Sequence, residues 1–170
     1  MVALGETGLD FFRMLSPRPE QEAAFRWHLA LSRETGKPVV VHVRDAWDRA
    51  MEVLAEEPAA GVILHCFSGT PDIAHECVRR GYFVSFAGPI TYPKNQHLRE
   101  AAAAIPMSHV LVETDSPYLS PQPLRGRENA PQNVSFVVDA IADARGLARE
   151  RVAEAVFDNA RRAFPGLREA

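Results

Sequence analysis

Residues 2–10 of the chain read Val-Ala-Leu-Gly-Glu-Thr-Gly-Leu-Asp, an apolar run that passes directly into two carboxylates and two glycines. The apolar part, residues 2–4, predicts a short β-strand, and Glu6 follows at its C-terminal end. Three other polar residues stand in the same place after short apolar runs: His42, His65 and Asp115. Because the C-terminal ends of parallel strands meet at one edge of a sheet or one rim of a barrel, we expect these four side chains to converge.

Apolar runs rich in β-branched residues alternate with longer segments of helical periodicity. The predicted strands are residues 2–4, 39–42, 62–65, 82–86 and 110–113. The predicted helices are residues 20–35, 46–56, 71–80, 98–104, 133–145 and 149–164. In the first helix Phe25, Leu29 and Ser32 share one face, and Gly36 follows its end. The alternation is typical of repeated β-α units with parallel strands, so residues 1–170 are predicted to form one α/β domain.

The composition places the chain of 170 residues, with 46% hydrophobic and 24% charged residues, among soluble globular proteins. A net charge of −3 excludes a broad basic surface for duplex nucleic acid, although an enzyme that grips only a chain end can be acidic. No apolar stretch approaches the roughly 20 residues of a membrane span, and no secretory signal is evident, so the cytoplasm is the expected compartment. Cys66 and Cys77 are then expected to be reduced, with a disulfide between them as the alternative.

The four polar residues after the strands suggest a divalent metal site. A single histidine after three aliphatic residues would usually belong to the core, but His42 and His65 on separate strands, with Glu6 and Asp115 on two others, are better explained by coordination. Mixed imidazole and carboxylate ligands suit Zn or Mn, and Mg is compatible with the carboxylates. The alternative for residues 5–10 is a glycine turn in which Asp10 caps the backbone.

Asp115 is the predicted general base. A carboxylate that touches both a metal and a bound water can accept a proton from that water while the metal lowers the water's pKa. The alternative is a turn or helix-cap aspartate before Pro117.

Several residues are predicted to bind a phosphate. Arg44 lies two residues beyond His42 on the same face of an extended segment, where its guanidinium can bind a phosphate through two hydrogen bonds. A solvated side chain, or an ion pair with Asp45 or Asp48, is the alternative. Ser68 begins the loop after His65, where a hydroxyl and backbone N–H groups can hold a phosphate oxygen.

A long proline-rich loop, residues 116–132, follows the last predicted strand, and loops of this length often carry function. Its Arg125, Arg127 and Asn129 are predicted to contact a nucleic-acid end, with plain solvation of the charges as the alternative. Phe67 and Tyr118 are candidates for stacking on a base, although packing is the expected role for both.

Five ordered motifs resemble those of the TatD family of metal-dependent deoxyribonucleases. They cover residues 5–10, 38–44, 65–69, 113–119 and 125–131. The resemblance implies a TIM-like barrel of the amidohydrolase type that holds one or two divalent metals and hydrolyses phosphodiester bonds at DNA 3′ ends, with single-stranded DNA as the expected substrate. It also implies that Glu6 bridges the metals and takes part in catalysis, that His42 and His65 bind one metal, and that Asp115 binds the other and accepts the proton.

The sequence departs from the family pattern in one respect, because no His-x-His pair occurs in it. In the family this pair ends a first strand that precedes two further β-α units. We therefore expect a partial barrel of about five parallel strands, with two exposed sheet edges through which the chain can associate with itself. The alternatives are another amidohydrolase-type enzyme acting on ester, amide or aminoacyl bonds, or a truncated metal-binding chain without turnover.

Overall fold

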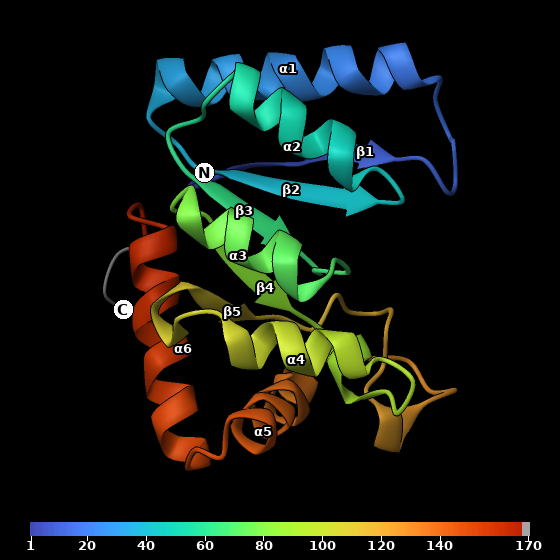
Figure 1. The fold of residues 1–170 in the computed structure, drawn as a ribbon, viewed down its shortest axis with the longest axis vertical. Coiled ribbons are helices and arrows are strands. Elements are labelled where there is room, and N and C mark those ends of the chain that lie inside the picture. Colours follow the sequence, from blue (N-terminus) through green and yellow to red (C-terminus); the bar gives the residue numbers. More distant parts are fainter. Residues whose placement is uncertain (168–170) are drawn as a thin grey trace. The chain divides into compact units, whose positions relative to one another are not determined.

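The computed structural model describes residues 1–167, which divide into two compact units. Unit 1 contains Met1–His65 and the segment that begins at Arg161, and unit 2 contains Cys66–Ala160. Strands and helices alternate along both units, as the sequence pattern predicts (Figure 1). The single-domain assignment of residues 1–170 stays a prediction.

Unit 1 is built on three parallel strands, β1 (Leu4–Asp10), β2 (Val39–Arg44) and β3 (Val62–His65). The order in space follows the order in sequence, so β2 lies between the other two. Its register pairs His42 with Gly8 on one side and with His65 on the other. Two ligand-type side chains are thereby placed opposite one another on neighbouring strands.

Two helices, α1 (Arg18–Thr35) and α2 (Trp47–Glu56), connect these strands and lie side by side (Figure 1). Helix α1 buries Phe25, Leu29 and Ser32, the face predicted from the sequence, and ends at Gly36, whose φ of 66° is left-handed. Glu22 of α1 forms ion pairs with Arg26 in α1 and Arg49 in α2. Burial of the apolar face fixes α1 on the sheet, and the ion pairs join the outer sides of the helices.

Strand β1 differs from its prediction. It runs over Leu4–Asp10 rather than residues 2–4, so the glycines lie within the strand and the alternative of a glycine turn is wrong. A register irregularity between Leu4 and Thr7 accommodates the extra residue, and Thr7 and Leu9 are buried at alternating positions. Glu6 therefore lies in the irregular part of a strand and not after its end.

Unit 2 contains the parallel pair β4 (Phe83–Phe86) and β5 (Val110–Val112), in which Val84 faces Val110. Its α-helices are α3 (Pro71–Arg79), α4 (Gln96–Ala104), α5 (Val134–Arg145) and most of α6 (Arg149–Ala163). Buried Asn159 of α6 donates hydrogen bonds of 2.7 Å to the carbonyls of Met107 and Val110. This amide ties the last helix to the start of β5.

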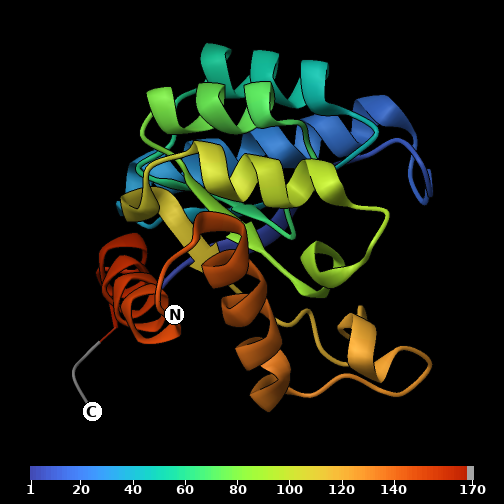
Figure 2. The same cartoon turned by 60° about the horizontal axis from the view of Figure 1, so that its bottom comes forward.

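The loop between β5 and α5 carries short 3₁₀ turns, η3 (Gln122–Leu124) and η4 (Pro131–Asn133), and is drawn in orange in Figure 2. Its first part packs on another 3₁₀ turn, η1 (Gly88–Thr91), so tightly that a Cβ at Gly88 would lie 1.9 Å from the Leu119 carbonyl oxygen. The remaining 3₁₀ turn, η2, covers Met107–His109. Within residues 1–167, no helix has both the length and the apolar character of a membrane span.

Candidate active site

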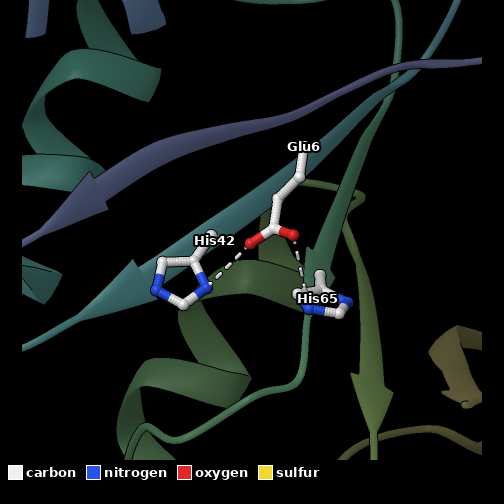
Figure 3. Close-up of side chains that lie close together, drawn as sticks. All are labelled: Glu6, His42 and His65. Atoms are coloured by element: carbon white, nitrogen blue, oxygen red, sulfur yellow. Dashed lines mark ion pairs between the residues drawn. The ribbon is translucent and has the colours of Figure 1, made fainter. Parts of the chain in front are cut away.

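Three of the four predicted metal ligands meet in unit 1. Glu6 on β1, His42 on β2 and His65 on β3 each offer a ligand atom, and these atoms all lie within 4.8 Å of one another (Figure 3). The imidazole centroids of the two histidines are 6.3 Å apart. Adjacent strands thus supply one ligand each, as the sequence predicts, although only His65 ends its strand.

Glu6 lies between the two imidazoles. Its Oε1 is 3.0 Å from Nδ1 of His42, and its Oε2 is 3.9 Å from Nε2 of His65 (Figure 3). The hydrogen bond from His42 lowers the pKa of Glu6 below its ordinary value, although partial burial opposes this. Glu6 is therefore an anionic carboxylate at neutral pH, as a metal ligand must be.

The glycines beside Glu6 bring β1 unusually close to β2. A Cβ at Gly5 would lie 2.7 Å from the Val40 carbonyl oxygen, and one at Gly8 would lie 2.0 Å from that of His42. Both glycines also have positive φ angles, 131° and 134°. No other residue fits these positions unless the strands separate, so the glycines set the distance from Glu6 to His42.

Asp10 has a role that the sequence indicated only in part. Its Oδ1 accepts hydrogen bonds from the backbone N–H groups of Phe12 and Arg13 at 2.9 and 2.7 Å, which is the capping role given as the alternative for this segment. Its Oδ2 also lies 3.5 Å from Nε2 of His42. His42 consequently has a carboxylate beside each ring nitrogen, and an outer carboxylate of this kind orients a metal-binding imidazole.

The donor set of this cluster fits a divalent transition metal. One carboxylate and two imidazoles on three strands form the mixed oxygen and nitrogen environment that Zn and Mn accept. Two of the three side chains are partly buried, which limits competition from solvent. Glu6, His42 and His65 would hold one such ion and leave coordination positions for water or substrate.

Arg44 ends β2 two residues beyond His42, so both side chains leave the same face of the strand. Its guanidinium carbon lies 4.0 Å from the ring centroid of Phe12, an exposed aromatic residue. Among residues 1–167 Arg44 forms no ion pair with Asp45 or Asp48. Sequence reasoning missed Phe12, whose only signal was an aromatic pair directly after the acidic segment.

The other predicted site residues belong to unit 2. Asp115 lies three residues past β5 with a left-handed φ of 57°, a conformation that aspartate tolerates, and its carbonyl accepts a 2.9 Å hydrogen bond from Tyr118 N–H. Ser68 is exposed in the loop before α3. The roles of Asp115 and Ser68 next to the three residues of unit 1 stay predictions.

Asn129 has a different environment from the one that its predicted substrate contact requires. Its amide is buried, and Nδ2 donates 2.7 Å hydrogen bonds to the carbonyls of Thr114 and Tyr118. Its Oδ1 accepts from Ala130 N–H and from the Asn133 amide, both at 2.9 Å. With donors and acceptor engaged inside the loop, the geometry favours a structural role for Asn129 over contact with substrate.

Arg125 is exposed on the same loop, and its guanidinium carbon lies 4.4 Å from the ring centroid of Tyr92. This aromatic support was not evident from the sequence, because Tyr92 lies far from Arg125 along the chain. Substrate binding by Arg125 stays a prediction, and its accessible guanidinium is compatible with it.

Comparison with known proteins relates the chain to one family. The family model "TatD related DNase" matches residues 1–165. A metal-dependent hydrolase of Bacillus subtilis, YabD, is 38% identical over 166 residues, which are 96% of this chain and 65% of that protein. A Klebsiella pneumoniae protein named 3′-5′ ssDNA/RNA exonuclease TatD is 40% identical over 153 residues, 86% of this chain and 58% of its own length.

Solved structures give the same relationship. The TatD homologue YJJV of Escherichia coli K12 matches with a TM-score of 0.89 and 28% identity over 98% of this chain and 64% of that one. A TatD family hydrolase of Entamoeba histolytica, 20% identical, matches with a TM-score of 0.85 over 96% of this chain and 63% of its own. The predicted TIM-barrel-like α/β fold class is thereby confirmed. The chain spans less than two thirds of these relatives, and it belongs to the TatD related DNase family.

Proposed function

We propose that this protein is a metal-dependent phosphodiesterase that removes nucleotides from the 3′ ends of single-stranded DNA. The observation that carries the proposal is the cluster of Glu6, His42 and His65, whose ligand atoms lie within 4.8 Å of one another. A relative named as a 3′-5′ ssDNA/RNA exonuclease supports this substrate class. Mg, Mn and Zn are the candidate ions, and one is the number that these three residues can hold.

A divalent ion in this cluster would supply Lewis-acid chemistry to a phosphate and to the attacking water. Asp115 accepts the proton that the water loses on attack, and Arg44 stabilises the negative charge that develops on the phosphate oxygens. Arg44 is suited to this because its guanidinium can offer two N–H groups to a phosphate, while its Cζ lies 4.0 Å from the centroid of the Phe12 ring. Ser68 is proposed to bind a further phosphate oxygen.

The test is release of mononucleotides from single-stranded DNA labelled at its 5′ end, with EDTA-treated protein and added Mn²⁺, Mg²⁺ or Zn²⁺. We expect shortening from the 3′ end that requires metal, and a loss of about 100-fold or more in rate for Asp115→Asn. Asp158→Asn, on the exposed side of α6, is the matched control and should keep the rate. Normal rates in Asp115→Asn would remove Asp115 from the mechanism.

Arg44→Ala separates this reaction from its enzymatic alternative. A phosphodiesterase needs a cationic side chain beside the phosphate, so Arg44→Ala should slow cleavage of bis(p-nitrophenyl) phosphate by about tenfold or more, and Arg44→Lys should recover part of it. An esterase or amidase would hydrolyse p-nitrophenyl acetate at a rate that neither change affects. Metal binding with no turnover of any substrate would favour the non-catalytic alternative.

Association of the chain with itself through exposed sheet edges remains part of the proposal, as does a cytoplasmic location. Light scattering coupled to size exclusion tests the first, and we expect a mass above the 18.8 kDa of a monomer. A monomeric mass at all concentrations would show that the chain does not associate through its sheet edges.

A further inference from the structure

The loop after Asp115, together with Tyr92, lines an open pocket of about 310 Å³. Its lining residues include two tyrosines, Tyr92 and Tyr118, and two arginines, Arg125 and Arg127. Among the described residues, no carboxylate lines it, and neither arginine takes part in an ion pair. In a chain with a net charge of −3, this local excess of positive charge favours an anionic occupant.

Hydrogen bonds within unit 2 hold the pocket in shape. The hydroxyl of Tyr92 donates to the Ser120 carbonyl at 2.9 Å, and the hydroxyl of Ser120 donates to the Arg127 carbonyl. The guanidinium carbon of Arg125 lies 4.4 Å from the centroid of the Tyr92 ring. These contacts fix the lining residues relative to one another, which reduces the entropic cost of binding.

The two kinds of lining side chain recognise different parts of a ligand. Arg125 is exposed, and its guanidinium carbon lies 4.4 Å from the centroid of the Tyr92 ring, so its N–H groups are accessible to a phosphate. Tyr118 is 71% exposed, so a broad area of its ring is open for stacking with a planar group. The volume lies at the small end of ligand pockets, enough for one nucleotide and too small for a duplex.

We propose that this pocket binds the terminal nucleotide of a single DNA strand, with its phosphate on Arg125 and Arg127 and its base stacked on Tyr118. The proposal rests on the proposed function for its choice of a DNA end. The pocket lies in the same loop as Asp115, whose carbonyl accepts a hydrogen bond of 2.9 Å from the Tyr118 N–H group.

The test is calorimetric binding of 2′-deoxyadenosine 5′-monophosphate (dAMP) to the 170-residue protein in EDTA. Removing metal ions ensures that phosphate bound to metal contributes nothing to the signal. We expect dAMP to bind at least tenfold more tightly than inorganic phosphate or deoxyadenosine, because only dAMP engages both the arginines and the ring. A single-stranded tetranucleotide of deoxyadenosine should compete with dAMP, since its end occupies the same pocket.

Variants of Arg125 and Tyr118 test which side chain binds the phosphate and which binds the base. Arg125→Gln should weaken dAMP binding about tenfold and leave the weak binding of deoxyadenosine unchanged. Tyr118→Leu should weaken dAMP binding by a similar factor, whereas Tyr118→Phe keeps the ring and should bind within about twofold of the parent. Arg151→Gln, an exposed arginine on α6, removes the same charge at a distance from the loop and should bind as the parent does.

The proposal fails if dAMP binds no more tightly than phosphate, if both Arg125→Gln and Tyr118→Leu bind normally, or if the tetranucleotide does not compete. These results are independent of nuclease activity. If the protein binds dAMP in this pattern but cleaves no DNA, the proposed pocket stands and the proposed reaction is wrong. If it cleaves DNA without binding dAMP, the proposed reaction stands and the proposed pocket is wrong.

Discussion

Gly8 of β1 packs directly on the backbone of His42 in β2, so that a Cβ at residue 8 would lie only 2.0 Å from the His42 carbonyl oxygen. The absence of a side chain at Gly8 therefore determines how closely β1 approaches β2, the strand that carries the proposed metal ligand His42. The position of Glu6 depends on this approach, because Glu6 also lies on β1 and its carboxylate is 3.0 Å from Nδ1 of His42.

Gly8→Ala should push β1 away from β2. We expect it to lower the free energy of unfolding by more than about 3 kcal/mol, because the clash is with backbone and cannot be relieved by a rotamer change. Gly36→Ala is the control, since Gly36 also has a positive φ but no atom within 4 Å of the added Cβ, and should cost about 1 kcal/mol. Urea unfolding of both variants measures the difference, and equal midpoints would show that the strands can separate without cost.

His65→Ala should weaken metal binding more than changes to the surrounding residues do. We expect Mn²⁺ affinity, measured by titration calorimetry, to fall by more than about 100-fold, because a ligand is removed. Asp10→Asn leaves the ligands but alters the carboxylate 3.5 Å from His42, so the loss should be closer to about tenfold. His97→Ala, an exposed histidine of α4, should have no effect. If all three variants bind Mn²⁺ alike, the cluster of Glu6, His42 and His65 is not the metal site.

Glu22→Gln should destabilise the protein in a manner that depends on pH. Hydrogen bonds from Arg49 and Arg26 lower the pKa of Glu22 to about 2, from an ordinary value of 4.5. A lowered folded-state pKa means that Glu22 stabilises the fold fully above pH 4.5, and that this stabilisation is lost as the pH falls toward 2. Because the pair is partly solvated, we expect a loss of about 1 kcal/mol at pH 7.

Urea unfolding of Glu22→Gln and the parent at several pH values tests this. The difference in unfolding free energy should be constant from pH 7 to about pH 5 and shrink below it. A difference that grows at acid pH would have the wrong sign and would show that Glu22 is not held as an anion by the arginines.

Cys77 should resist alkylation in the folded protein. Its side chain is fully buried in α3, and burial raises the pKa of the thiol to about 12, so almost no thiolate exists at pH 8. Among the described residues no disulfide joins Cys66 to Cys77, so the disulfide alternative is wrong for this structure. Mass spectrometry after iodoacetamide treatment should show at most one label on the native chain and two after unfolding in urea. Rapid double labelling of native protein would contradict the burial of Cys77.

Asn129→Ala should reveal whether this residue is structural. Removing the amide takes away the donors to the Thr114 and Tyr118 carbonyls, and we expect a loss of about 3 kcal/mol in unfolding free energy. Gln132→Ala changes an exposed amide of the same loop and should cost less than about 0.5 kcal/mol. Unchanged thermal stability of Asn129→Ala, with weaker DNA binding, would restore the substrate contact predicted from the sequence.

Most of the fold could be predicted from the sequence because β2, β3 and β5 contain continuous aliphatic runs. β3 matches its predicted bounds, and β4 and β5 match within one residue. β1 could not be predicted in full, because glycine and aspartate disfavour isolated strands and only pairing with β2 keeps residues 5–10 extended. The same pairing explains why Glu6 reaches His42 from inside a strand.

The site shows where sequence reasoning is limited. Glu6, His42 and His65 were predicted because strand order alone brings them together. The contacts of Arg44 with Phe12 and of Arg125 with Tyr92 depend on the path of loops, which residue spacing does not specify. Asn129 was assigned to substrate because it lies in the long loop after Asp115, and its burial depends on how that loop folds onto itself.

Because His42 pairs with His65, the two imidazoles lie together only when β2 and β3 are correctly aligned. A slip of β2 by one residue against β3 would turn the His42 imidazole to the opposite face of the sheet, away from the other two ligands. Misaligned molecules would then bind metal poorly, while correctly aligned ones would be stabilised by it. A divalent ion would thus favour, during folding, the one strand register in which residues from three strands meet.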